Sequence, residues 1–205
     1  MLAAIAERQQ SKLWERRQSI RKYKDIPVKR QIIEEILQAG SLAPSSKNRQ
    51  PWRFVVVMGN AKESMLCAMQ AGLEREKIYP LLPESKCYCG GAEYTMKIMQ
   101  AAPVIIFVIN SLGIDIHRSL TTEERISEIC NIQSIGAAME NMELAATEHG
   151  LGSLWICDTF FAYDELNQWL DSEGELVAAM AIGYTDEAPP ARPRNKLRDI
   201  VVWRT

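Results

Sequence analysis

The sequence has few of the features on which small disulfide-bonded or membrane-spanning proteins depend. It contains five cysteines, an odd number with no repeated pair, so a reducing compartment is favoured over a disulfide framework. Its longest apolar run, residues 101–109, has about half the length that a membrane-spanning helix needs. The chain reaches Glu7 and Arg8 too early for the apolar region of a signal peptide. We therefore expect a cytoplasmic protein without a membrane partner.

A large excess of one charge and clustered metal ligands are also absent. The 24 lysines and arginines nearly balance the 26 aspartates and glutamates, and a net charge of −2 gives no basic field for nucleic acid. The two histidines, His117 and His149, have no partners at ligand spacing, so no metal site is expected. Any phosphate that the protein binds must be held locally.

Common nucleotide-site and hydrolase motifs are missing as well. The sequence contains neither a GxxxxGK[ST] phosphate loop nor a GxSxG nucleophile turn. Gly150 and Gly152 are followed by Trp155, where a dinucleotide-binding fingerprint needs a third glycine. These absences disfavour phosphate-loop, hydrolase and Rossmann-type proteins.

The composition and hydrophobic periodicity predict one α+β domain over residues 1–205. With 47% hydrophobic residues the chain can bury a substantial core, and no linker or repeat divides it. Helices are predicted over residues 3–18, 28–39, 61–73, 92–101, 121–149 and 163–170. Strands are predicted over residues 52–58, 104–110, 153–157 and 175–184, separated by helices.

Two segments carry more specific expectations. Residues 74–90, which include Pro80 and Pro83, are predicted to form an irregular connection. In the long helix over residues 121–149, hydrophobic side chains at helical spacing are expected on the buried side, among them Ile126, Ile129 and Ile132.

Cations gather in two short segments of the chain. One lies at the end of the first predicted helix and contains Arg16, Arg17, Arg21, Lys22 and Lys24; the other is the C-terminal tail with Arg192, Arg194, Lys196 and Arg198. A solvated charged surface is the simpler interpretation of such clusters. However, Ser19 places a hydroxyl between Arg17 and Arg21, an arrangement suited to a phosphate monoester. Prolines beside Arg192 and Arg194 favour an extended tail whose side chains can reach a fixed target.

Residues 40–51 are predicted to form a loop rich in hydrogen-bond donors. Prolines, serines and Asn48 are concentrated there, directly before the first predicted strand. Loops of this composition are often binding loops.

Four segments together resemble the nitroreductase family of FMN-dependent oxidoreductases. They are Arg17-Gln18-Ser19-Ile20-Arg21-Lys22-Tyr23, residues 43–52, residues 150–156, and residues 181–184 followed by Arg192-Pro193-Arg194. They occur in the family's order and near its usual separations, so the resemblance covers nearly the whole chain. It implies a central, mostly antiparallel sheet flanked by helices, in an interlocked homodimer with FMN at each of two subunit interfaces.

The resemblance also implies which residues bind FMN. Arg17, Gln18 and Ser19 correspond to contacts with the phosphate and ribityl end, and Arg192 and Arg194 to cations that neutralise the phosphate. Arg21 and Lys97 correspond to cations beside the pyrimidine side of the flavin. Pro44, Ser45, Ser46 and Asn48 correspond to a loop from the second chain. The strand that includes Leu154, Ile156 and Cys157 corresponds to backbone facing the flavin edge.

The implied activity is ping-pong electron transfer from NADH or NADPH, through FMN, to nitroaromatic, quinone or related acceptors. The cofactor carries this chemistry, so no catalytic side chain is assigned. Alternatives on the same fold are reductive dehalogenation, enone reduction and oxygen-dependent flavin breakdown. A flavin-binding protein without turnover and a plain interaction domain are alternatives of other classes.

Several positions depart from the family pattern. Tyr94 stands where an amide side chain is frequent, and packing is an equal alternative for it. Cys157 stands where glycine is frequent, and a small buried apolar residue is its simpler interpretation. The variable segment 74–93 falls where the family varies its pocket cover, and we expect it to influence substrate choice.

Overall fold

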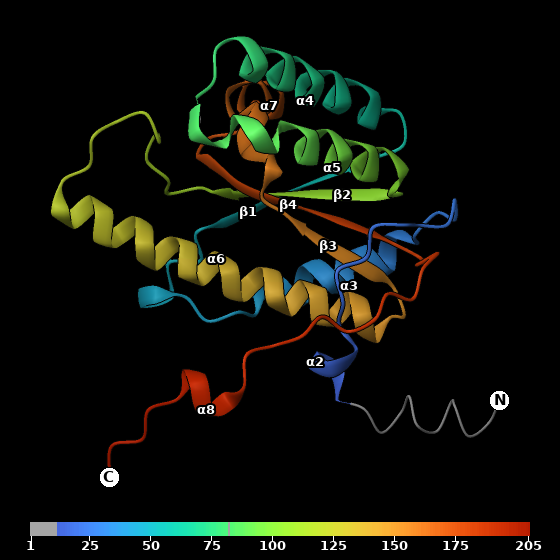
Figure 1. Cartoon of the computed structure of the whole chain (residues 1–205), viewed down its shortest axis with the longest axis vertical. Coiled ribbons are helices and arrows are strands. Elements are labelled where there is room, and N and C mark those ends of the chain that lie inside the picture. Colours follow the sequence, from blue (N-terminus) through green and yellow to red (C-terminus); the bar gives the residue numbers. More distant parts are fainter. Residues whose placement is uncertain (1–11, 82) are drawn as a thin grey trace.

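A four-stranded antiparallel sheet forms the centre of the computed structural model, which describes residues 12–81 and 83–205. The strands are β1 (Trp52–Met58), β2 (Val104–Asn110), β3 (Gly152–Ile156) and β4 (Glu175–Gly183). Their order across the sheet is β1-β2-β4-β3, with antiparallel neighbours throughout (Figure 1). The expectation of an α+β fold with a mostly antiparallel sheet is confirmed.

Helices cover both faces of the sheet. One face carries α3 (Arg30–Ser41) and α6 (Thr122–Glu148); the other carries α4 (Ala61–Ile78), α5 (Cys89–Ala101) and α7 (Tyr163–Leu170) (Figure 1). Shorter elements are α2 (Leu13–Arg16), α8 (Leu197–Ile200) and the 3₁₀ turns η1 (Ser46–Asn48), η2 (Pro83–Tyr88) and η3 (Asp158–Ala162).

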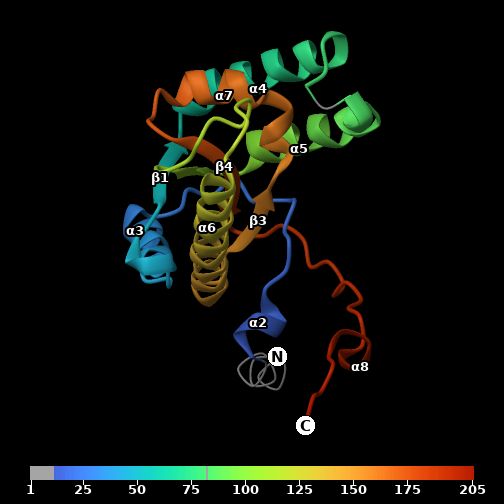
Figure 2. The same ribbon diagram turned by 90° about the vertical axis from the view of Figure 1, so that its left-hand side faces the viewer.

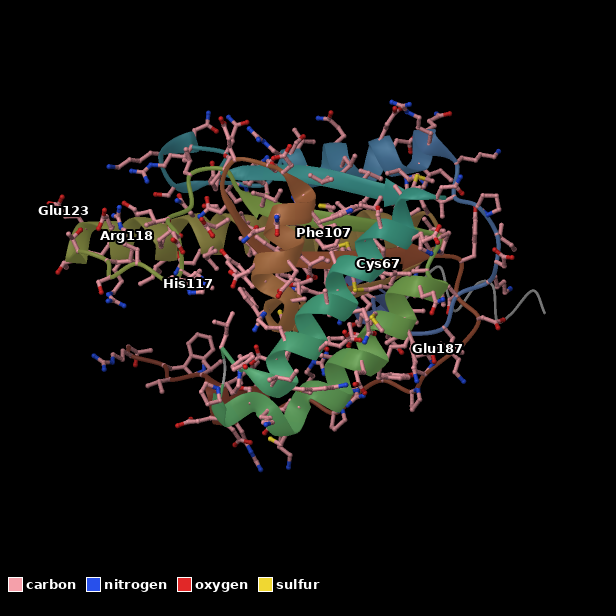
Figure 3. All side chains as sticks on the ribbon, turned by 90° about the horizontal axis from the view of Figure 1, so that it is seen from above. Cys67, Phe107, His117, Arg118, Glu123 and Glu187 are labelled. Carbon is pink, nitrogen blue, oxygen red and sulfur yellow. The ribbon has the colours of Figure 1, made fainter. Side chains whose placement is uncertain are left out.

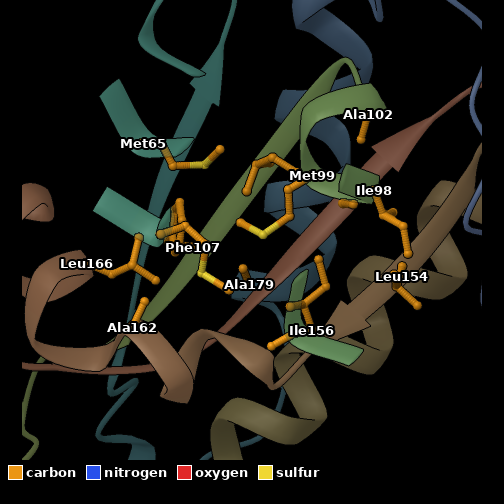
Figure 4. Close-up of a cluster of buried hydrophobic side chains, with 14 of the residues drawn as sticks. Met65, Ile98, Met99, Ala102, Phe107, Leu154, Ile156, Ala162, Leu166 and Ala179 are labelled. Carbon is orange, nitrogen blue, oxygen red and sulfur yellow. The ribbon is translucent and has the colours of Figure 1, made fainter. Parts of the chain in front are cut away.

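Strand β2 is buried along its whole length because it lies between the two helical layers. Successive side chains of a strand point to opposite faces. Ile105 and Phe107 accordingly pack in the cluster beneath α4, α5 and α7, whereas Val104 and Ile106 pack in the cluster beneath α3 and α6. Figure 4 shows the first cluster, where Phe107 lies among aliphatic and methionine side chains. This arrangement explains why the strand reads as an unbroken apolar run.

The predicted irregular connection over residues 74–90 is largely helical. Helix α4 continues to Ile78, and α5 already begins at Cys89. The extra turn of α4 is anchored by Arg75, which pairs with Glu165 of α7 at 2.8 Å and with the buried Glu76 at 2.6 Å. The pair with Glu165 is a tertiary contact that local sequence patterns do not reveal, and it stabilises the extension.

The predicted burial of Ile126, Ile129 and Ile132 is wrong. They are 57%, 52% and 43% exposed, and the first two lie away from the face of α6 on which Ile135 is buried. A helix of 27 residues is about 40 Å long at about 1.5 Å per residue. A strand of seven residues spans only about 23 Å. The buried residues of α6 accordingly begin at Asn131, and the turns before it extend past the sheet (Figure 1).

Within the described residues, the first predicted helix ends two residues earlier than expected. Residues 3–11 of that prediction lie outside the described residues, and α2 ends at Arg16. The chain is extended from Arg17, with φ −62° and ψ 126°. Pairing with the central sheet, described below, replaces the helical conformation in this segment.

Candidate functional site

The predicted basic segment, residues 17–24, lies across the ends of two strands. The Ile20 N–H donates to the Ser153 carbonyl at 2.8 Å, at the start of β3. The Lys24 N–H donates to the Tyr184 carbonyl at 2.8 Å, just past the end of β4. Residues distant in sequence therefore fix the backbone of this segment, which gives its side chains defined positions.

Two further side chains hold the same segment. The Tyr23 hydroxyl donates to the Ile20 carbonyl at 2.8 Å, and burial raises the pKa of this phenol. Glu187 accepts the backbone N–H of Arg21 at 2.5 Å and that of Lys22 at 3.2 Å. Because Glu187 stands directly before the proline-rich tail, its carboxylate connects the basic segment to the start of that tail.

The extended segment directs polar side chains to a cleft and one apolar side chain to the core. Arg17, Ser19 and Arg21 recur at every second position and line a cleft, while Ile20 is buried, 7% exposed, against Gly152. The guanidinium of Arg21 also donates to the Ser19 carbonyl at 3.3 Å. Both arginines and Ser19 thus line the same cleft.

The cleft has a volume of about 680 Å³ and brings the two predicted cation clusters together. Its lining residues are Trp14, Glu15, Arg17, Gln18, Ser19, Arg21, Pro189, Pro190, Ala191, Arg192, Pro193 and Arg194. The tail side chains are exposed, and Arg194 donates to the Arg192 carbonyl at 3.3 Å. Four arginines and one hydroxyl around a single cavity are a set of donors and charges suited to a phosphate-like anion.

Arg17 has an ion-pair partner behind the cleft. Its Nη1 lies 3.6 Å from Glu143 Oε2 on α6, and the two side chains are 17% and 4% exposed. Glu143 also accepts a hydrogen bond of 2.9 Å from the hydroxyl of Ser153. Local sequence patterns do not mark Glu143 or Glu187 as site residues. For Glu143, the one sequence feature that could indicate a role is an acidic residue on the buried side of a predicted helix.

The serine-rich loop lies elsewhere in this chain. The Ser46 N–H donates to Ser134 Oγ on α6 at 3.2 Å, and Ser45 Oγ accepts the Gln50 N–H at 3.0 Å. Pro44 and Asn48 are exposed. None of these loop residues lines the described cleft.

Backbone strain is concentrated in the same loop. Lys47, Asn48 and Gln50 have φ of 54°, 55° and 49°, values in the left-handed region that side chains disfavour. Such strain persists where the surrounding structure fixes it, and it often occurs in ligand-binding loops.

Helix α6 separates the serine-rich loop from the cleft. Ser134, which contacts the loop, and Glu143, which contacts Arg17, are about two and a half turns apart, on opposite sides of the helix. Figure 2, which looks along α6, shows α3 on one side of it and α2 with the C-terminal tail on the other. Within one chain, the loop and the arginines therefore face different regions.

Strand β3 supplies the predicted backbone edge. Leu154 and Ile156 are buried in the core, whereas Cys157, directly after the strand, is exposed. The interpretation of Cys157 as a buried apolar residue is therefore wrong, because the chain leaves the sheet at this position. Partial desolvation raises the pKa of the Cys157 thiol, and Asp158 raises it further. The thiol is thus a poor nucleophile near neutral pH.

Lys97 and Tyr94 lie on α5, one turn apart and both exposed. This spacing places them on the same side of the helix. Neither lines the cleft formed by the described residues. Their predicted relation to a flavin ring remains a prediction.

Within residues 12–81 and 83–205, the structure does not support a metal site or a membrane-spanning helix. No group of three or more histidine, cysteine, aspartate or glutamate side chains there could hold a metal ion. Each histidine pairs instead with one carboxylate, His117 with Asp164 and His149 with Glu35, both at 3.0 Å. In the same residues, no helix combines the length and apolarity required to cross a membrane.

Comparisons with known proteins show a family model that matches most of the chain, together with similar curated proteins and solved structures. The family model described as "Nitroreductase family" matches residues 15–184. The nitrobenzene nitroreductase of Ectopseudomonas oleovorans is 27% identical, over 85% of this chain and 86% of its own. The solved FMN-dependent nitroreductase of Clostridium difficile R20291 is 26% identical, with a TM-score of 0.67 over 94% of this chain and 98% of that one. The NfnB structure from Mycobacterium smegmatis, in complex with NADPH, is 20% identical but shares the fold, with a TM-score of 0.74 over 100% of both chains.

Proposed function

The chain belongs to the nitroreductase family, and on this premise we propose that it is an FMN-dependent NAD(P)H oxidoreductase acting on nitroaromatic, quinone or related electron-poor acceptors. The observation that carries the proposal is the cleft in which Arg17, Ser19 and Arg21 meet Arg192 and Arg194. These groups match the charge and the hydrogen-bonding needs of a phosphate monoester, which is the terminal group of FMN.

The residues of the cleft bind and orient the cofactor. Arg17, Arg192 and Arg194 hold the phosphate by charge, while Gln18 and Ser19 contact the phosphate and ribityl end. When bound, FMN supplies the redox chemistry, accepting a hydride from NADH or NADPH and passing electrons to the acceptor in a ping-pong cycle.

Strand β3 and nearby cations serve the ring end of the cofactor in this proposal. The backbone of Leu154, Ile156 and Cys157 faces the flavin edge, and hydrogen bonding to β4 keeps β3 rigid. Arg21 and Lys97 stabilise the negative charge that gathers on the pyrimidine side on reduction. No side-chain acid or base is needed for this half of the reaction.

The functional unit that we propose is a homodimer with FMN at the subunit interface. Pro44, Ser45, Ser46 and Asn48 reach the cleft of the partner chain, since α6 separates them from the cleft of their own chain. Helix α6 exposes Ile126, Ile129 and Ile132. The C-terminal tail exposes Leu197, Ile200, Val202 and Trp203, at 62% to 85%. Apolar surface of this extent is typical of protein interfaces.

The segment 74–93 is proposed to cover the acceptor. It exposes Tyr79 and Tyr88, at 75% and 66%, and Tyr94 follows directly at 52%. Exposed aromatic rings of this kind suit stacking on a flat acceptor. We also propose a cytoplasmic location, which the free state of all five cysteines supports.

Equilibrium binding and product analysis test the proposed function. The flavin-free protein is titrated with FMN, and the loaded protein is then reduced and offered a nitroaromatic and a quinone without oxygen. Saturable FMN binding followed by formation of reduced products is expected. Failure to bind FMN contradicts the proposal. Products of dehalogenation, enone reduction or flavin breakdown redirect it to another chemistry on the same fold.

A further inference from the structure

A buried carboxylate stands directly behind the phosphate cleft. Glu143 of α6 is 3% exposed, and the family resemblance assigns it no role. Its Oε1 accepts the Ser153 hydroxyl at 2.9 Å, and its Oε2 lies 3.6 Å from Nη1 of Arg17. The residue thus contacts both the flavin-edge strand and one of the phosphate-binding arginines.

The surroundings of Glu143 make Arg17 its nearest counter-ion. On its own helix, Glu140 adds negative charge, and Arg16 donates to the Thr147 carbonyl one turn further along. The negative charge of Glu143 also contributes to the raised pKa of the buried Tyr23 phenol. Burial raises the pKa of Glu143, while the hydrogen bond from Ser153 and the charge of Arg17 oppose this effect.

Arg17 therefore has two possible anionic partners, one on each side. Its side chain lines the cleft and is simultaneously paired with Glu143. A phosphate entering the cleft shares the guanidinium with a carboxylate of the same sign, and the two anions repel each other strongly in a poorly solvated site.

We propose that Glu143 is a specificity-determining residue of the flavin site, where its carboxylate competes with the FMN phosphate for Arg17. The competition limits how strongly the cleft prefers a phosphorylated flavin over riboflavin, which lacks the phosphate. The inference rests on the proposed function, because it assumes that the cleft binds FMN.

The charge of Glu143 is tested separately from its shape by Glu143→Gln. Glutamine keeps the volume and can still accept the Ser153 hydroxyl, but it carries no charge. Dissociation constants for FMN and riboflavin are measured by titration of flavin-free protein. In E143Q the dissociation constant for FMN is expected to fall roughly tenfold, which means tighter binding, because one repulsive charge near the phosphate is lost. The constant for riboflavin is expected to change by less than about twofold.

Glu148→Gln provides the matched control. Glu148 is on the same helix and has the same charge, but it is exposed, so solvent screens it. Neither dissociation constant should change in this variant by more than about twofold.

The pH dependence gives a readout that a purely structural role does not change. Protonated Glu143 no longer competes, so the FMN constants of wild type and E143Q should converge as the pH falls. Comparing the two proteins at each pH cancels the ionisation of the FMN phosphate itself. The difference should widen towards higher pH, where Glu143 is ionised.

Several results overturn the inference. Unchanged FMN affinity in E143Q, weaker FMN binding, or an equal change for both flavins each contradicts competition at Arg17. If E143Q does not fold, Glu143→Leu removes the charge with an apolar group, a change that buried ion pairs often tolerate. The same shift in preference is then required. A wild-type protein that binds no FMN contradicts the proposed function instead.

Discussion

At the scale of single residues, the arginines of the cleft contact carboxylates from distant parts of the chain. The N–H of Arg21 donates to Glu187, and the guanidinium of Arg17 pairs with Glu143. The sequence could predict the arginines and Ser19, because they form a local pattern. It could not predict Glu143 and Glu187, because their partners lie 126 and 166 positions away and no local spacing signals such contacts.

Removing one phosphate-binding cation is expected to weaken FMN binding selectively. Arg17→Ala or Arg194→Ala should cost about 1.5 to 3 kcal/mol of FMN binding energy, the usual value of a charged hydrogen bond. Riboflavin binding should be nearly unchanged. Fluorescence titration measures both. Arg30→Ala is the control, since Arg30 is exposed on α3 and pairs with Glu34. Equal losses of FMN affinity in R17A and R30A would contradict the assignment of Arg17 to the phosphate.

The His117–Asp164 pair predicts a pH-dependent contribution to stability. The hydrogen bond to Asp164 raises the pKa of His117 in the folded protein. A raised folded pKa gives stability that is fully present below the unfolded pKa, about 6.5, and is lost as the pH rises through the folded pKa. The melting temperature of wild type should therefore exceed that of His117→Gln at acidic pH, and the difference should shrink at alkaline pH.

Flavin binding serves as the control for this pair. Figure 3 shows His117 well apart from Glu187, which holds the backbone of the basic segment, so the histidine is remote from the cleft. FMN affinity should be the same in wild type and H117Q at every pH. A stability difference that grows with rising pH contradicts the sign of the effect.

At the scale of elements, the strands were predicted more accurately than the helices. Strands β1 and β2 have the predicted bounds because both are bordered by turn residues. Helix α4 continues past its predicted end because Arg75 finds partners on α7 and in its own turn. The segment after α2 is extended because β3 and β4 offer it hydrogen bonds. Tertiary contacts of this kind override the local periodicity from which helices are predicted.

Substitution by alanine should have opposite effects on stability at two glycines, one closely packed and one in open space. A Cβ at Gly72 would lie 2.3 Å from the Ala162 Cα, a backbone atom that cannot move aside cheaply. Gly72→Ala should therefore destabilise the fold by about 2 to 3 kcal/mol. A Cβ at Gly91, in α5, meets nothing within 4 Å, so Gly91→Ala should stabilise it by about 0.5 to 1 kcal/mol.

Urea unfolding of the flavin-free variants measures both changes. A neutral G72A variant would show that α4 can move away from η3. A destabilised G91A variant would show that the space beside α5 is filled in solution.

At the scale of the whole molecule, the separation of the loop from the cleft is the main argument for a dimer. The sequence resemblance provided this expectation, and no pattern in a single chain could, because the sequence does not specify which copy a loop contacts. The described chain leaves large apolar side chains exposed both on α6 and in the C-terminal tail. A second copy explains both features together.

Mixing two defective chains tests whether the site is shared. One chain carries Arg17→Ala and Arg194→Ala, and the other carries Ser45→Ala, Ser46→Ala and Asn48→Ala. In a mixed dimer, one site combines an intact loop with intact arginines. Co-expressed, doubly tagged dimers should bind one FMN with wild-type affinity, while each parent dimer binds weakly. Mixed dimers no better than the parents contradict a shared site.

The central claim, that this cleft holds an FMN through which NAD(P)H electrons pass, is tested most directly by one spectrum. The FMN-loaded protein is mixed without oxygen with NADH, then in a separate sample with NADPH, while the visible flavin absorption is recorded. The band should disappear with at least one donor and return when a nitroaromatic or quinone is added. A protein that takes up no FMN, or whose bound FMN keeps its absorption with both donors, would contradict the claim.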